Sequence, residues 1–101
     1  MLYHANLAHA NLFRALLDTA NLSGVNLSGA NLSGSYPTHA SLESANLTHA
    51  NLHQADLTGA NLDGANLLGA DLTQVTWSNT ICPDGTNSST LVPQSCVGHG
   101  G

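Results

Sequence analysis

The residues of this chain that could do chemistry are six histidines, six carboxylates and two cysteines. The histidines are His4, His9, His39, His49, His53 and His99. A metal site needs several imidazole, thiolate or carboxylate ligands that converge on one point. A pair of carboxylates acts in acid–base catalysis only where a cleft holds the substrate. Whether any of these side chains converge depends on the elements that carry them.

The two cysteines, Cys82 and Cys96, lie near the end of the chain. A disulfide between them would close a loop of about 15 residues and contribute about 3 kcal/mol. It would also indicate an oxidising compartment, the periplasm or the thylakoid lumen. Two alternatives stay open: free cysteines in a cytoplasmic protein, and a zinc site that includes His99 but lacks obvious further ligands. We favour the disulfide.

The composition of the chain argues against several classes of function. Arg14 is the only lysine or arginine, and the formal net charge is −5, so we expect no nucleic-acid binding through phosphate contacts. No apolar run is long enough to cross a bilayer, so we expect no membrane insertion. Aromatic residues make up 4% of the chain, which leaves alanine and leucine to build a core.

A five-residue repeat runs from Leu2 to Trp77 without a change of frame. We divide it into blocks from Ala5 onward and number the positions of each block 1 to 5. Position 3 holds Leu at 14 of its 15 occurrences between residues 2 and 72, and Pro37 is the exception. Position 1 holds Ala at 12 of its 15 occurrences between residues 5 and 75. Position 2 is usually Asn, and positions 4 and 5 vary.

A period of five excludes an amphipathic helix, because each step of five residues turns a helix by about 140° and scatters the leucines around it. Positions 1 and 3 are two residues apart, and such residues lie on the same side of an extended strand. Each block is therefore predicted to be a very short strand with its small residue and leucine inward, followed by a turn. Equal strands and turns form coils, and coils stack into a solenoid.

The tandem A-[N/D]-L-x-x pattern of residues 2–77 resembles the pentapeptide-repeat family. The resemblance implies an all-β fold, a right-handed quadrilateral parallel β-helix with one block on each face and about four coils. The segment WSNTICPDGT, followed by a second cysteine, is similar to the C-terminal ending of some cyanobacterial members. We expect a β-helix over residues 1–79 and a C-terminal tail over residues 80–101 that caps the last coil.

Because a four-sided coil has 20 residues, residues 20 apart in the sequence lie in one column of the solenoid. The columns therefore show which candidate side chains can lie close together. No column holds histidines in consecutive coils, and Glu43 with Asp63 supplies too few oxygens for calcium, so we expect no metal, cofactor or catalytic residue. Outward asparagines in one column are expected to hydrogen-bond between coils. The block Ser35–His39 is predicted to form a local bulge or a weakened bridge, because Pro37 cannot donate to the ladder.

These observations favour a non-enzymatic structural or protein-interaction module. Another protein is the expected partner, and self-association through the first coil, which has no visible cap, is a second expectation. The residues predicted to make contacts are Leu16, Tyr36, Phe13, Arg14 and Leu68, of which Leu16 and Tyr36 share a column.

Two alternative functions stay open at this point. Some members of the family resemble DNA in shape and charge and act on DNA gyrase, although this chain is only modestly acidic. Ice or surface binding through the column of Thr38, Thr58 and Ser78 is the other, although that column is short and also carries the charge of Asp18.

Overall fold

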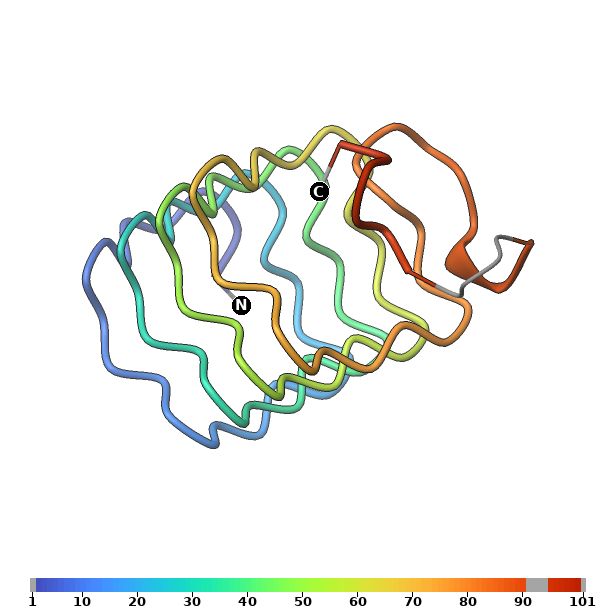
Figure 1. Ribbon diagram of the computed structural model, residues 1–101. Helices are drawn as coiled ribbons and strands as arrows, with labels where there is room; N and C mark the ends of the chain where they lie inside the picture. Colours follow the sequence, from blue (N-terminus) through green and yellow to red (C-terminus); the bar gives the residue numbers. More distant parts are fainter. Residues whose placement is uncertain (1, 91–94, 101) are drawn as a thin grey trace.

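The structure is a computed structural model, and it describes residues 2–90 and 95–100. The chain winds into a right-handed quadrilateral parallel β-helix whose coils stack along one axis, and its C-terminal tail folds against one end (Figure 1). The molecule measures 33 × 23 × 21 Å along its principal axes. The predicted all-β solenoid is therefore confirmed.

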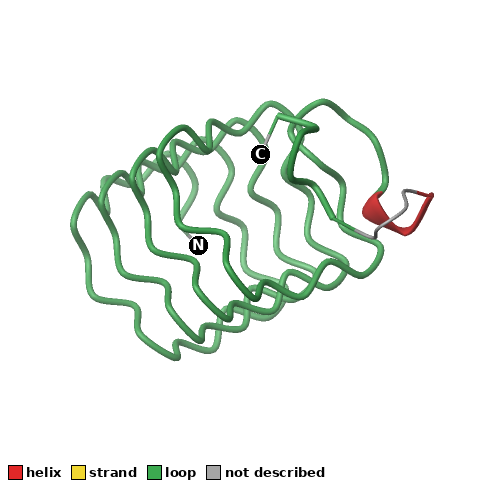
Figure 2. Ribbon diagram, in the orientation of Figure 1, coloured by secondary structure: helices red, strands yellow, loops and turns green. Residues whose placement is uncertain are grey.

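Parallel β-bridges join residues 20 apart, from Asn6–Asn26 at one end to Asn61–Ile81 at the other. Each block is so short that its extended part makes one bridge on each side. Within the described residues, the only regular element is therefore the 3₁₀ helix η1 (Ser88–Thr90), and the rest is drawn as loop and turn (Figure 2).

Backbone hydrogen bonds tie each coil to the next in a fixed pattern. The Leu27 N–H donates to the Asn46 carbonyl (2.7 Å), and the Asn46 N–H donates back to the Val25 carbonyl (2.9 Å). A third bond starts at position 5, where the Gly29 N–H donates to the Thr48 carbonyl (2.9 Å). The polar groups of these very short strands are satisfied in this way, as a buried backbone requires.

The core consists of the leucines at position 3 and the small residues at position 1. In the middle of the molecule these leucines are 1% exposed or less, as at Leu22, Leu27, Leu47, Leu52, Leu57 and Leu62. Leu7, Leu12 and Leu17 in the first coil are only partly buried, because a coil covers them on one side only. Burial therefore depends on stacking between two coils, as expected for a repeat protein.

Position 5 forms the corner of the square, and its backbone is left-handed throughout the repeat. Its φ values are positive at glycines such as Gly29 (66°) and at other residues such as His9 (61°) and His49 (58°). The four corner histidines each lie over a glycine in the next coil, in the pairs His4–Gly24, His9–Gly29, His39–Gly59 and His49–Gly69. These histidines therefore have a packing role, since each ring occupies the space that a glycine leaves free.

Replacing Gly29 by alanine is expected to destabilise the protein by about 2 kcal/mol, because the new residue keeps a left-handed backbone and meets an occupied space. A Cβ at Gly29 would lie 2.5 Å from His9 Nδ1, whereas at Gly64 its nearest neighbour is Ser44 Oγ at 3.4 Å. Gly64→Ala is thus the matched control, with a cost of about 1 kcal/mol from backbone strain alone. Urea denaturation followed by Trp77 fluorescence measures both, and equal costs would contradict the packing role of His9.

The asparagines at position 2 do not form the ladders between coils that the sequence predicted. Each side-chain oxygen instead accepts from the backbone N–H two residues later: the Ser28 N–H donates to Asn26 Oδ1 and the Thr48 N–H donates to Asn46 Oδ1 (both 3.1 Å). Asn and Asp readily form such local turns, because the acceptor is already close in the chain. The prediction was wrong because this short-range bond satisfies the side-chain oxygen within its own block.

The block Ser35–His39 keeps the register of its neighbours, so the predicted bulge is wrong. Tyr36 bridges Leu16, and its N–H donates to the Ala15 carbonyl at 3.0 Å. The weakened bridge is confirmed, because the ladder lacks a bridge between Tyr36 and Asp56, where Pro37 has no N–H to donate. Pro37 itself is buried in place of a leucine.

Ser35 lies at position 1 of this block and is 0% exposed. Its Oγ is the one buried side-chain polar atom without a hydrogen-bond partner among the described residues. Ser35→Ala is therefore expected to stabilise the protein by about 1 kcal/mol, because an unsatisfied hydroxyl is removed from the core. Ser33→Ala, at the partly exposed position 4, is the control and should change stability by less than about 0.5 kcal/mol. A loss of stability in Ser35→Ala would show that the hydroxyl has a partner.

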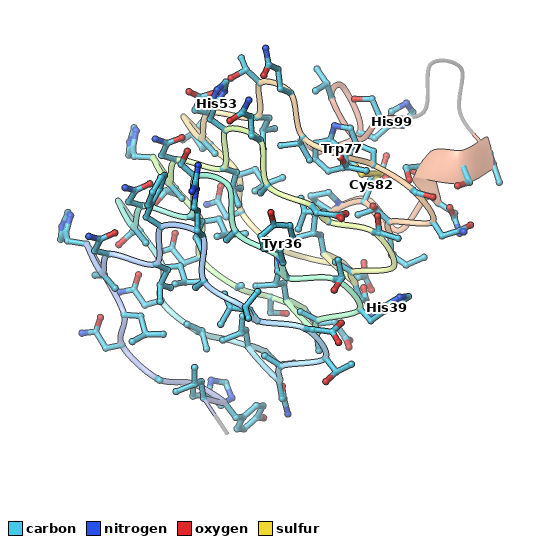
Figure 3. All side chains as sticks on the ribbon, turned by 90° about the horizontal axis from the view of Figure 1, so that it is seen from below. Tyr36, His39, His53, Trp77, Cys82 and His99 are labelled. Atoms are coloured by element: carbon cyan, nitrogen blue, oxygen red, sulfur yellow. A yellow bond between two sulfur atoms is a disulfide. The ribbon has the colours of Figure 1, made fainter. Side chains whose placement is uncertain are left out.

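The C-terminal tail folds back on the last turn of the β-helix. Asn87 pairs antiparallel with Ile81, and the Ser88 hydroxyl accepts from the Thr80 N–H (3.0 Å) and donates to the Trp77 carbonyl (3.2 Å). A disulfide joins Cys82 and Cys96, both fully buried, which confirms the expected pairing. Figure 3 shows Trp77, Cys82 and His99 at this same end of the molecule.

Candidate functional site

Four of the five predicted contact residues lie on or beside one corner of the first two coils, and we call them the outer patch: Phe13, Arg14, Leu16 and Tyr36. Leu16 and Tyr36 are bridge partners in adjacent coils and are 82% and 47% exposed. The Arg14 guanidinium lies 5.2 Å from the centre of the exposed Phe13 ring. The patch therefore combines apolar surface with the only arginine of the chain.

Position 2 of the repeat makes the pair Leu16 and Tyr36 unusual. Between residues 6 and 76 this outward position otherwise holds only Asn, Asp, Ser or Thr. The two apolar exceptions are neighbours in one column. A single exposed apolar residue needs no explanation, whereas these two adjacent ones form a small apolar area on an otherwise polar face.

Leu68, the fifth predicted contact residue, lies far along the solenoid in the fourth coil and is 72% exposed. It borders an open hollow of about 720 Å³ that also contacts Leu67, Ala70, Leu72, Val97 and Gly100. Val97 could not be predicted as a neighbour of Leu68, because the tail has no repeat that assigns its residues to columns. The structure therefore separates Leu68 from the outer patch and joins it to the tail.

The histidines and carboxylates do not converge. Within residues 2–90 and 95–100, no three His, Cys, Asp or Glu side chains come together in a way that could hold a metal ion. His99 contacts Asp84 across the cap, with 3.2 Å between Nδ1 and Oδ2. The Thr86 hydroxyl and N–H both donate to the Asp84 carboxylate, and these bonds, with a smaller contribution from His99, lower the pKa of Asp84.

One line of polar groups resembles a relay, formed by Asp71, Thr73 and His53. The Thr73 hydroxyl donates to Asp71 Oδ1 (2.6 Å) and lies 2.6 Å from His53 Nδ1. The hydroxyl bond, and then the bond from the Thr73 N–H, lower the pKa of Asp71. A carboxylate with a lowered pKa is a weaker base, so this arrangement does not suit general-base chemistry near neutral pH.

Thr73→Val is expected to raise the pKa of Asp71, because it removes the larger of the two bonds that favour the charged form. The lowered pKa means that this carboxylate stabilises the fold above its unfolded pKa, and that the contribution is lost as the pH falls through the folded value. NMR titration of the carboxyl groups measures the shift. Asp84, held by Thr86, is the internal control and should not move. An unchanged Asp71 would contradict the assigned cause.

The threonines of the predicted water-ordering column are engaged in side-chain bonds. The Thr38 hydroxyl donates to Asp18 Oδ1 (2.6 Å), and the Thr58 hydroxyl donates to Asp56 Oδ1 (2.5 Å). No observation on this face adds support to ice or surface binding. Among the described residues, no helix has the length and hydropathy to span a membrane.

The chain was compared with known protein families, curated proteins and solved structures. The family model for pentapeptide repeats matches residues 2–36 and 38–76 in eight copies, so the match omits only Pro37 within this range. None of the curated proteins matches the chain.

The solved structures that resemble the chain include two pentapeptide repeat proteins with a TM-score above 0.5. A pentapeptide repeat protein from the cyanobacterium Cyanothece 51142 is 37% identical and has a TM-score of 0.63, with 77% of this chain and 56% of that protein covered. A pentapeptide repeat protein from the Arabidopsis thaliana thylakoid lumen is 30% identical and has a TM-score of 0.54, with 79% and 59% covered. The chain thus spans less than two thirds of the length of either protein. By its repeat, its fold and these matches, the chain belongs to the pentapeptide-repeat family.

Proposed function

We propose that this protein is a non-enzymatic scaffold that binds another protein through the outer patch. The observation that carries the proposal is the pairing of Leu16 and Tyr36, the two apolar residues at an otherwise polar outward position. The rigid ladder fixes both side chains on one flat face, so little side-chain order has to be gained on binding. Arg14 beside Phe13 adds a cation to an otherwise acidic surface and favours a partner with an acidic group next to an apolar one.

A photo-crosslinking amino acid at position 16 or 36, in the host cells, tests this proposal. We expect one discrete adduct from either position and none from the control position Asn51, which is exposed at position 2 of another block. An excess of wild-type protein should compete for the adduct, whereas the Leu16→Ser/Tyr36→Ser variant should not. Equal adducts from all three positions, or none from any, would remove the outer patch as a binding surface.

The compartment is a second part of the proposal. The Cys82–Cys96 disulfide fits an oxidising compartment, the periplasm or the thylakoid lumen. A relative from the Arabidopsis thaliana thylakoid lumen agrees with the second of these. Thiol labelling of the protein, quenched rapidly in acid from its host cells, should find both cysteines blocked until a reductant is added. Labelling without reductant would point to the cytoplasm.

A further inference from the structure

Along residues 65–74, the last coil has backbone groups that no described residue pairs with, and we call this segment the C-terminal edge. One coil earlier, four N–H groups donate to the next coil: Leu47 to Asn66, His49 to Leu68, Leu52 to Asp71 and Gln54 to Thr73, at 2.8 to 3.0 Å. The equivalent N–H groups of the C-terminal edge are those of Leu67, Gly69, Leu72 and Gln74. Among the described residues, none of these four has an acceptor. The Ala65 and Ala70 carbonyls likewise accept no bond there.

The cap pairs with a different part of the last turn of the β-helix than the C-terminal edge. Thr86 and Ser88 pair with Cys82 and Thr80, so the described tail completes the edge of residues 80–82. The Ser88 hydroxyl covers the Trp77 carbonyl beside it. The described part of the cap thus pairs with neither of the two sides formed by residues 65–74, and unpaired sheet edges are templates for another strand.

An apolar hollow lies directly beside these free groups. It has a volume of about 720 Å³, and Leu68 and Val97, which are 72% and 61% exposed, both border it. Leu72 is only partly buried, whereas Leu52 beneath it is 1% exposed. The core of the solenoid is therefore open at the same place as its backbone edge.

We propose that the C-terminal edge binds an extended segment of a partner protein, which adds to the β-helix as one further parallel strand. The donors come in pairs two residues apart, Leu67 with Gly69 and Leu72 with Gln74, which is the spacing of carbonyls along one side of an extended chain. Apolar side chains at alternate positions of that segment would fill the hollow above Leu67 and Leu72.

The charge near the hollow favours a basic segment. Asp71 lies between two residues that border the hollow, and Asp84 contacts His99 next to the bordering Gly100. Arg14, the only Lys or Arg of the chain, is in the first coil, far from this end. The expected ligand is thus an extended peptide with small or leucine side chains inward and lysine or arginine outward. This surface is separate from the outer patch, so either proposal can fail alone.

Amide hydrogen exchange in the free protein is the first test. We expect the N–H groups of Leu67, Gly69, Leu72 and Gln74 to exchange about 100-fold faster than the matched groups of Leu47, His49, Leu52 and Gln54, which are bonded in the same way one coil earlier. Comparable protection in the two sets would mean that the edge is already covered, and it would overturn the proposal.

Titration with a peptide, followed by amide chemical shifts, is the second test. The probe is a synthetic peptide with the sequence of residues 25–34, VNLSGANLSG, which forms the same two sides of the square in this chain. A second peptide has lysine in place of both serines and is expected to bind about threefold more tightly at low salt. Both should shift the four free amides, and the shifts should persist in the Leu16→Ser/Tyr36→Ser variant.

Two matched substitutions complete this experiment. Leu68→Arg places a positive charge at the border of the hollow and should weaken binding of the lysine peptide about tenfold. Leu16→Arg makes the same chemical change on the outer patch and should leave that binding unchanged. An absence of shifts with both peptides, or shifts at Asn6 and Asn11 in the first coil instead, would overturn the proposal.

Discussion

Replacing Leu47 by alanine is expected to lower the free energy of unfolding by about 3–5 kcal/mol. Leu47 is 0% exposed and lies in one column between Leu27, also 0% exposed, and Leu67, at 4%. Both neighbouring coils are fixed by backbone bonds, so they cannot move in to fill the cavity, and the loss should lie near the upper end for this substitution. Native proteins typically have a stability of about 5–15 kcal/mol, so this one substitution should remove a large part of the total.

The same column supplies a matched control for this prediction. Leu7 has the same chemistry and position but is only partly buried, so Leu7→Ala should cost about 1–2 kcal/mol. Leu68→Ala, on the surface, should cost less than about 0.5 kcal/mol. Trp77 is the only tryptophan and is 7% exposed, so its fluorescence reports unfolding in urea. Equal losses at Leu47 and Leu7 would contradict the view that burial here requires a coil on both sides.

Loss of the disulfide is expected to cost about 3 kcal/mol, because it closes a short loop and so restricts the unfolded chain. Cys82 and Cys96 are 14 residues apart in the sequence. The other described bonds that hold residues 95–100 are the contact between His99 and Asp84 and the bond from the Asp84 N–H to the His99 carbonyl (3.3 Å). The His99 and Asp84 side chains are both exposed, and an exposed pair of charged groups contributes little to the free energy of unfolding.

The test compares the Cys82→Ala/Cys96→Ala variant with the wild type in urea, each with and without a reductant. Reductant should lower the midpoint of the wild type to that of the variant and leave the variant itself unchanged. Residues 95–100 should lose protection from amide exchange, while the Leu47 amide, in the middle of the solenoid, should keep it. A reduced wild type as stable as the oxidised protein would show that the tail is held by other contacts.

The repeat made most of the architecture predictable, because one physical argument applies at every block. Leucine and alanine two residues apart require an extended backbone, and the unbroken frame fixes which residues stack. The frame also places Cys82 in the column of Leu62, where the structure has it buried and bonded to Cys96. Column neighbours such as Leu16 and Tyr36 followed from the same count.

The remaining features depend on local competition or on the aperiodic tail. Asn46 has a structural role, but its side-chain oxygen accepts from the Thr48 N–H of its own block and not from another coil, because a donor two residues away is already close. Pro37 costs the ladder one bridge, but the stacked coils on either side hold its block in register. Neither the antiparallel pairing of Asn87 with Ile81 nor the hollow beside Val97 could be predicted from the sequence, because the tail has no repeat that assigns its residues to columns.

The alternation of histidine and glycine at the corners has a consequence for how such a chain can change length. A coil is 20 residues long, so deleting residues 25–44 would preserve the leucine frame. It would also bring His9 against His49, two rings at a place where each now faces a glycine. Deleting 40 residues, from 25 to 64, would instead bring His9 against Gly69. At this corner, losing the single coil that carries Gly29 therefore brings two histidine rings together, whereas losing it together with the coil that carries His49 leaves a histidine over a glycine.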